Sequence, residues 1–232
     1  MLFNSSSRIL VVAAHPDDEI LGCGGTLCRA IDCGATIKVL FLGEGVSARF
    51  PIGQYDSAQF QNDTKKRTIG AVQALNHLGV SDYIFGTRYC TQFDTVPLRS
   101  IVDEIEDIIG QFNPTIVFTH NPSEVNIDHR ISYEATEIAC RPTRQNGPTG
   151  IYAFEIVCSG NWKFDPFFKP NVFVDINDVW QRKLDAWHCY EGEARPFPFP
   201  RSDQGLDTLA KMRGMTAGLI RAEAFQLLRK IV

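Results

Sequence analysis

Short apolar runs alternate with longer amphipathic stretches along the first 140 residues of the chain. The first run, residues 8–14, reads RILVVAA, which is typical of a strand buried on both faces of a sheet. Residues 58–78 form a long amphipathic stretch that indicates a helix. When strands and helices alternate in this way, the strands form a parallel sheet and helices cover both of its faces.

The expected elements follow from this patterning and from the residues that end each stretch. Gly34 and Gly79 end two helices, because glycine adopts the left-handed conformation past a helix end without steric cost. We predict a Rossmann-like α/β fold, a three-layer αβα arrangement around a mostly parallel sheet. Strands are expected over residues 8–14, 35–42, 82–85, 115–119, 151–158 and 172–176, helices over residues 22–33, 58–78, 98–112, 128–140, 178–190 and 206–230, and long loops over residues 43–56 and 191–201.

Composition narrows the class of protein. A chain of 232 residues, 44% hydrophobic and 22% charged, fits one globular domain over residues 1–232. Its net charge of −4 argues against a nucleic-acid partner, since phosphate binding requires a positive surface. Residues 1–7 lack the parts of a signal peptide, and no apolar run reaches the ~20 residues of a membrane helix. We therefore expect a cytoplasmic protein without a membrane span; the sequence does not indicate its oligomeric state.

A histidine and three acids follow the first expected strand directly, as His15-Pro16-Asp17-Asp18-Glu19. Open parallel sheets bind their ligands beyond the carboxyl ends of the strands. Adjacent carboxylates stay ionised at low cost only when water or a cation solvates them. The segment is thus either an acidic turn that solubilises the surface or part of a metal site.

The fourth expected strand ends near His120, and the loop beyond it leads to His129. A parallel sheet brings this loop beside the first one. His15, one aspartate of the first loop and His129 then make three ligands, which suits Zn²⁺ with an open fourth position for water. Two histidines at matching strand ends favour a metal site over the acidic turn.

These residues carry a resemblance to a known family. AHPDDEILGCGGT at residues 14–26 and VNIDHR at residues 125–130 resemble the two metal motifs of the PIG-L/LmbE family of zinc-dependent N-acetylglucosaminyl deacetylases. The similarity continues through Phe154-Glu155 and the tail at residues 200–225. The resemblance implies that His15, Asp18 and His129 bind the metal, which is Zn²⁺ or, alternatively, Fe²⁺ or another divalent ion. It also implies that Asp17 is the general base for the metal-bound water.

The sequence differs from the family's pattern at one position, Asn126. Several members of the family have a histidine there, three residues before the last ligand, where it stabilises the oxyanion. Asparagine donates a hydrogen bond but cannot pass a proton to the leaving amine. Either Asp17 returns the proton that it took, or His120 acts as a separate acid while Asn126 donates to the oxyanion.

Further roles are implied more indirectly. Glu19 and Asp128 are expected to orient the groups that bind the metal. The resemblance places Arg67 and Asp94 in the sugar pocket, and Arg201 lies in a proline-rich loop that could close over it.

The expected function is removal of an N-acetyl or other N-acyl group from a small amino-sugar substrate, free, nucleotide-linked or conjugated. No GxSxG elbow of a serine hydrolase and no GxGxxG of a dinucleotide-binding enzyme occurs. The alternatives are a catalytically silent carbohydrate-binding protein of the same fold and an amidase that acts on a non-sugar N-acyl amine.

Overall fold

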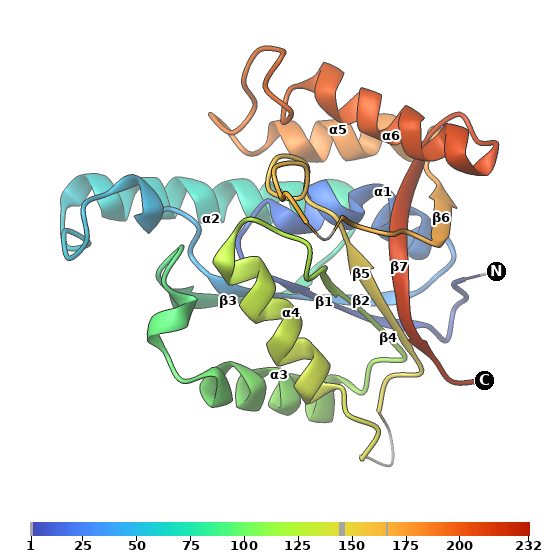
Figure 1. Cartoon of the computed structure of the whole chain (residues 1–232), viewed down its shortest axis with the longest axis horizontal. Coiled ribbons are helices and arrows are strands. Elements are labelled where there is room, and N and C mark those ends of the chain that lie inside the picture. The colour runs from blue at the N-terminus through green and yellow to red at the C-terminus, as the bar shows by residue number, and fades with distance from the viewer. Residues whose placement is uncertain (1, 144–146, 166) are drawn as a thin grey trace.

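A computed structural model describes residues 2–143, 147–165 and 167–232. Its strands form one sheet in the order β3-β2-β1-β4-β5-β7-β6 (Figure 1). Five of the strands, β1 to β5, run parallel, whereas β7 is antiparallel to both of its neighbours. This confirms the α/β fold with a mostly parallel sheet. The strands are β1 (Arg8–Ala13), β2 (Thr36–Gly43), β3 (Asp82–Arg88), β4 (Ile116–His120), β5 (Gly150–Phe154), β6 (Val172–Asp175) and β7 (Ala222–Lys230).

Helices cover both faces of the sheet, as the alternating pattern predicts. Figure 1 shows α3 and α4 on one face and α1, α2, α5 and α6 on the other. Alternate residues of β1 enter different cores, because successive side chains of a strand point to opposite faces. Val11 packs in the core that includes Trp187 of α5, and Val12 in the core that includes Ile105 of α3. The helices are α1 (Asp18–Asp32), α2 (Ala58–Leu78), α3 (Leu98–Phe112), α4 (Ile127–Ala139), α5 (Trp180–His188) and α6 (Asp203–Ala217).

Two of the expected helices, α2 and α3, have the predicted bounds. Gly79 ends α2 with a φ of 86°, and Gly34 follows α1 with a φ of 81°, so both glycines adopt the left-handed conformation expected of them. The start of α1 was misplaced: it begins at Asp18, four residues before the predicted residue 22. Strand β5 is also shorter than expected, because it ends at Phe154 rather than at residue 158.

The expected helix over residues 206–230 is wrong in its second half. α6 ends at Ala217, Gly218 leaves it with a φ of 73°, and residues 222–230 form β7. This strand pairs with β5 on one side and with β6 on the other. Its sequence AEAFQLLRK is rich in helix-forming residues, so the sheet overrides the local preference.

The order of the strands determines where a ligand site can form. β1 lies between β2 and β4. After β1 the chain forms β2 and β3 on one side of it, and then β4 and β5 on the other side. The loops after β1 and β4 therefore diverge at a topological switch point, where open α/β sheets bind their ligands. This edge carries both of the histidine-containing segments singled out in the sequence.

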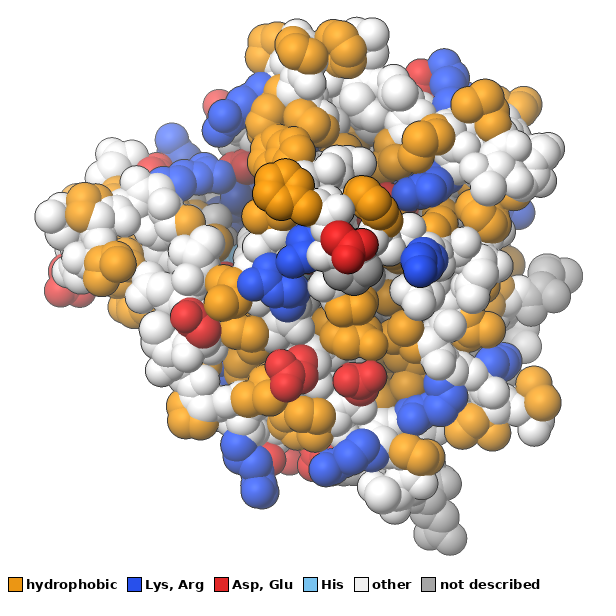
Figure 2. All heavy atoms as spheres, in the orientation of Figure 1, with side chains coloured by type: hydrophobic (Ala, Val, Ile, Leu, Met, Phe, Trp, Pro, Cys, Tyr) orange, Lys and Arg blue, Asp and Glu red, His pale blue; other side chains and the backbone are white. Residues whose placement is uncertain are grey.

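Figure 2 shows basic and acidic side chains interspersed, among the described residues, on the side of the surface that faces the viewer. Among the described residues, no helix is long and apolar enough to cross a membrane.

Candidate active site

The turn between β1 and α1 positions the first half of the site. Asp17 has a φ of 112°, a left-handed conformation that costs a residue other than glycine about 1–3 kcal/mol. Hydrogen bonds hold it there: its N–H donates to Oε2 of Glu19 at 3.0 Å, and its carbonyl accepts from the N–H of Leu21 at 3.0 Å. The strained turn sends the side chains of Asp17 and Asp18 to different partners.

Asp18 lies between two histidines in the interior. Ligand atoms of His15, Asp18 and His129 all lie within 4.8 Å of one another, and all three residues are buried. Oδ1 of Asp18 is 3.4 Å from Nε2 of His129 and accepts no hydrogen bond from any described residue. A buried carboxylate oxygen without a donor is costly unless a cation contacts it. Two imidazoles, this carboxylate and the unpartnered oxygen together fit a divalent metal ion.

Each of the two histidines is oriented by a carboxylate other than that of Asp18. Nε2 of His15 is 2.8 Å from Oδ2 of Asp128, which leaves Nδ1 to face Asp18 at 3.7 Å. Nδ1 of His129 is 3.3 Å from Oε2 of Glu124, which leaves Nε2 on the side of Asp18. Metal-binding histidines commonly donate their other N–H to a carboxylate in this way.

Cys90, His15 and Asp128 form a second group whose ligand atoms lie within 4.8 Å of one another. Both oxygens of Asp128 are already occupied there. Oδ1 accepts the N–H of Phe93 at 3.1 Å, and Oδ2 accepts the N–H of Thr91 and contacts His15. The unpartnered oxygen of Asp18 therefore favours the His15–Asp18–His129 set over this one.

Sequence reasoning missed Glu124. It is fully buried, and besides His129 it accepts from Nδ2 of Asn121 and the N–H of Ile156, each at 3.1 Å, and from the hydroxyl of Ser159. It thus ties the loop after β4 to the loop after β5. The available signal was an acid five residues before His129 in the same loop, which becomes informative only once the loop's fold is known.

Asp17 points to two arginines from distant parts of the chain. Its Oδ2 lies 3.1 Å from a guanidinium nitrogen of Arg67 on α2 and 2.9 Å from one of Arg201, in the loop before α6. Its Oδ1 accepts no hydrogen bond from the described residues. Burial raises the pKa of Asp17 above its ordinary value, while the charges of Arg201 and Arg67 oppose that shift. One oxygen of the carboxylate is thus held by two arginines, and the other is not held by any described residue.

Glu19 acts on Asp17 rather than on a histidine. One of its oxygens accepts the Asp17 N–H, and the other accepts the hydroxyl of Tyr190. Burial raises the pKa of Glu19 to about 8. Glu19 therefore supports the strained turn.

His120 ends β4 inside the site and is fully buried. Its Nε2 accepts the N–H of Ala14 at 2.9 Å, and its ring stacks on that of His129 at 4.0 Å between centroids. Burial lowers the pKa of His120 to about 4, so the imidazole is neutral at neutral pH. Since Nε2 accepts, Nδ1 carries the proton.

The two remaining predicted residues lie at the edge of the site. Asn126 is the N-cap of α4, where its Oδ1 accepts the N–H of Asp128 at 2.9 Å. Asp94 is exposed in the short 3₁₀ helix η2 (Phe93–Thr95), next to the Phe93 N–H that holds Asp128.

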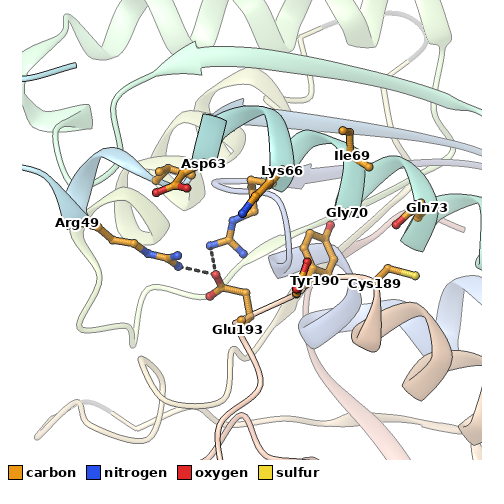
Figure 3. A pocket seen from close by; sticks show the side chains of 13 residues that line it. Arg49, Asp63, Lys66, Ile69, Gly70, Gln73, Cys189, Tyr190 and Glu193 are labelled. Carbon is orange, nitrogen blue, oxygen red and sulfur yellow. Dashed lines mark hydrogen bonds and ion pairs between the residues drawn. The ribbon is translucent and has the colours of Figure 1, made fainter. Parts of the chain in front are cut away.

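A cavity of about 460 Å³ lies beside the site, between α2 and residues 189–193 (Figure 3). Arg67, Tyr190 and Glu193 line it, and none of the three metal-binding candidates does. Arg67 thus stands between this cavity and Asp17.

Fold and site together define a class: an α/β protein with a buried His–Asp–His set at its switch point and a second carboxylate, that of Asp17, beside it. The chain belongs to the PIG-L family, described as GlcNAc-PI de-N-acetylase, whose family profile matches residues 10–140.

Relatives extend the similarity over most of the chain. It is 28% identical to a diacetylchitobiose deacetylase of Thermococcus kodakarensis, over 97% of this chain and 84% of that one. The structure of an N,N'-diacetylchitobiose deacetylase from Pyrococcus horikoshii has a TM-score of 0.76 at 21% identity, covering 96% of this chain and 84% of that one.

The fold also occurs in an enzyme with different chemistry. The structure of GalB, the 4-carboxy-2-hydroxymuconate hydratase from Pseudomonas putida, has a TM-score of 0.77 at 22% identity, covering 97% of this chain and 98% of that one. At this identity the likeness shows a common fold and leaves the reaction to be argued from the site.

Proposed function

We propose that the protein is a metal-dependent hydrolase that removes the N-acetyl group of an amino sugar or an amino-sugar conjugate. The observation that carries the proposal is the unpartnered Oδ1 of Asp18 between two oriented histidines, next to Asp17. The family and the named deacetylases support an amide bond as the one that is cleaved. A carbohydrate-binding protein without catalytic activity would not need these two histidines and Asp18 next to an Asp17 oxygen that accepts no hydrogen bond from any described residue.

His15, Asp18 and His129 would hold the ion. When bound, a divalent ion supplies a Lewis acid that lowers the pKa of water towards ~7 and polarises the amide carbonyl. Zn²⁺ suits two imidazoles and a carboxylate, and Fe²⁺ suits the same donors.

The chain's own residues carry the protons. Oδ1 of Asp17 takes a proton from the attacking water while Arg67 and Arg201 hold Oδ2. The oxygen of water bonds to the carbonyl carbon, the C–N bond breaks, and Asp17 returns the proton to the leaving nitrogen. The products are acetate and a free amine.

We assign both proton transfers to Asp17 on the geometry of His120. Its Nε2 is engaged by the N–H of Ala14, and the neutral ring stacks on His129. Its role is then to position His129. Accordingly, His120→Ala is expected to leave the shape of the pH profile of kcat/KM unchanged, and loss of a limb of that profile would return the acid role to His120.

Acetate release tests the function directly. The purified protein is stripped with a chelator, reloaded with Zn²⁺ or Fe²⁺, and given N-acetylglucosamine, diacetylchitobiose, a nucleotide-linked N-acetyl sugar and a non-sugar N-acetyl amine. We expect acetate from at least one sugar only after reloading. Acetate from the non-sugar amine alone would make the protein a different amidase. No acetate, together with consumption of 4-carboxy-2-hydroxymuconate, would make it a hydratase.

A further inference from the structure

Glu193 is a buried acid that the mechanism above does not use. It lies in the loop between α5 and α6, and its side chain is 9% exposed. Figure 3 shows the side chain of Arg49 next to its carboxylate. Oε1 is 2.5 Å from a guanidinium nitrogen of Arg49 and 3.1 Å from one of Arg67, and Oε2 is 3.8 Å from Arg201.

Glu193 and Asp17 share the same two arginines. Arg67 offers one nitrogen to Asp17 at 3.1 Å and the other to Glu193 at 3.1 Å. Arg201 contacts Asp17 at 2.9 Å and lies near Glu193. Arg67 therefore bridges the two carboxylates, and one nitrogen of Arg201 lies near both of them.

Charge explains why both carboxylates are needed. Removing a charged group from water costs several kcal/mol unless an opposite charge contacts it. Arg67 is buried and Arg201 is largely so, and Asp17 alone supplies one negative charge for two positive ones. Glu193 supplies the second. Arg49 adds little, because its side chain is half exposed and water screens the contact.

We propose that Glu193 is a positioning residue for the reaction: it holds Arg67 and Arg201 against one oxygen of Asp17, so that the other stays free for proton transfer. Without its charge, the two guanidinium groups repel each other across Asp17, and at least one of them shifts. The carboxylate of Asp17 then turns with it. Misplacing a reacting group by about 1 Å can cost a factor of 10² in rate.

This inference rests on the proposed deacetylase function, and the experiment separates the two. Glu193→Gln keeps the size of the side chain and removes its charge. Glu134→Gln is the control, because Glu134 is exposed on α4 and has no ion pair among the described residues. kcat, KM, bound metal and thermal midpoint are measured for both variants and for the parent on the sugar that releases acetate.

We expect Glu193→Gln to lower kcat by about 10- to 100-fold, with KM changed less than about threefold and metal content unchanged. Glu134→Gln should match the parent. Glu193→Asp keeps the charge and should recover part of the lost kcat. Equal kcat for Glu193→Gln and the parent, or for the Gln and Asp variants, overturns the inference.

A double-variant cycle tests whether Glu193 acts through Arg67. If Glu193 acts through Arg67, Glu193→Gln should cost little further kcat in an Arg67→Gln background, because interacting residues are not additive. Full additivity would contradict the inference. A parent protein that releases no acetate from any sugar would instead reject the proposed function.

Discussion

The residues that orient the metal-binding set matter as much as the set itself. His129 offers Nε2 towards Asp18 because Glu124 lies at Nδ1, and Glu124 is itself held by the N–H of Ile156 and by Asn121. His15 is oriented in the same manner by Asp128. A carboxylate thus orients each imidazole ring before any ion arrives, which lowers the cost of binding it.

Replacing Glu124 should therefore weaken metal binding without removing a ligand. We expect Glu124→Gln to lower the affinity for Zn²⁺ by about 10- to 100-fold, the usual effect of losing a carboxylate behind a metal-binding histidine. Competition with a chromophoric chelator measures this affinity. Glu134→Gln is the control, since Glu134 is exposed on α4, the helix that carries His129. Equal affinities for the two variants would show that Glu124 does not orient His129.

At the scale of residues, the sequence predicts site residues that lie within a recognisable motif. It does not predict those that the fold brings to the site from distant segments. His15, Asp18 and His129 stand in two recognisable segments, and the structure places them together. Glu193 is separated from Asp17 by 176 residues, the difference of their numbers, and approaches it only through Arg67 and Arg201. No local pattern marks such an acid.

Among the elements, α4 has an N-cap residue, Asn126, for which we also predict a role in the reaction. Asn126 caps the helix through Oδ1, while its Nδ2 donates to no described residue. We predict that this amide nitrogen donates to an oxyanion at the start of the helix, whose own dipole favours negative charge.

Two N-cap variants separate these uses. Ser57→Ala removes the cap of α2, and Asn126→Ala that of α4. Each should lower the free energy of unfolding by about 1 kcal/mol. Only Asn126→Ala should also lower kcat, by about 10- to 10³-fold, as expected for loss of an oxyanion donor. Denaturant unfolding and acetate release measure the two effects. Equal kcat in both variants would leave Asn126 as a helix cap alone.

The helices and strands also show which parts of the fold can be predicted from local sequence and which cannot. α2 and α3 were predicted at their bounds, because their apolar period and, for α2, a terminal glycine are local signals. β7 was taken for a helix, because its strand conformation depends on β5 and β6, which lie far from it in the chain. α1 begins early because the strained turn at Asp17 lets the chain enter a helix before the glycines.

Across the whole molecule, the site concentrates buried charge, and stability should therefore depend on pH. Burial raises the pKa of Glu19 from 4.5 to about 8, so the folded protein holds a proton that the unfolded chain releases. The stability that this proton provides is fully present below pH 4.5 and is lost as the pH rises through about 8.

Comparison with Glu19→Gln isolates this effect. In metal-free protein, the free energy of unfolding of the parent should fall relative to that of the variant between pH 5 and pH 8. The slope should reach up to about 1.4 kcal/mol per pH unit. Denaturant titrations at several pH values give the difference. A difference that stays constant over this range would mean that Glu19 is ionised in the folded protein.

The central claim is that Asp17 moves the proton while His15, Asp18 and His129 hold the ion. Asp17→Asn tests it most directly, because the change keeps the size of the side chain and removes the proton acceptor. Metal content and acetate release are measured on the same metal-reloaded samples of parent and variant. The account predicts equal metal content and a kcat lower by about 10²- to 10⁴-fold in the variant. Near-parental kcat with the metal in place would contradict it.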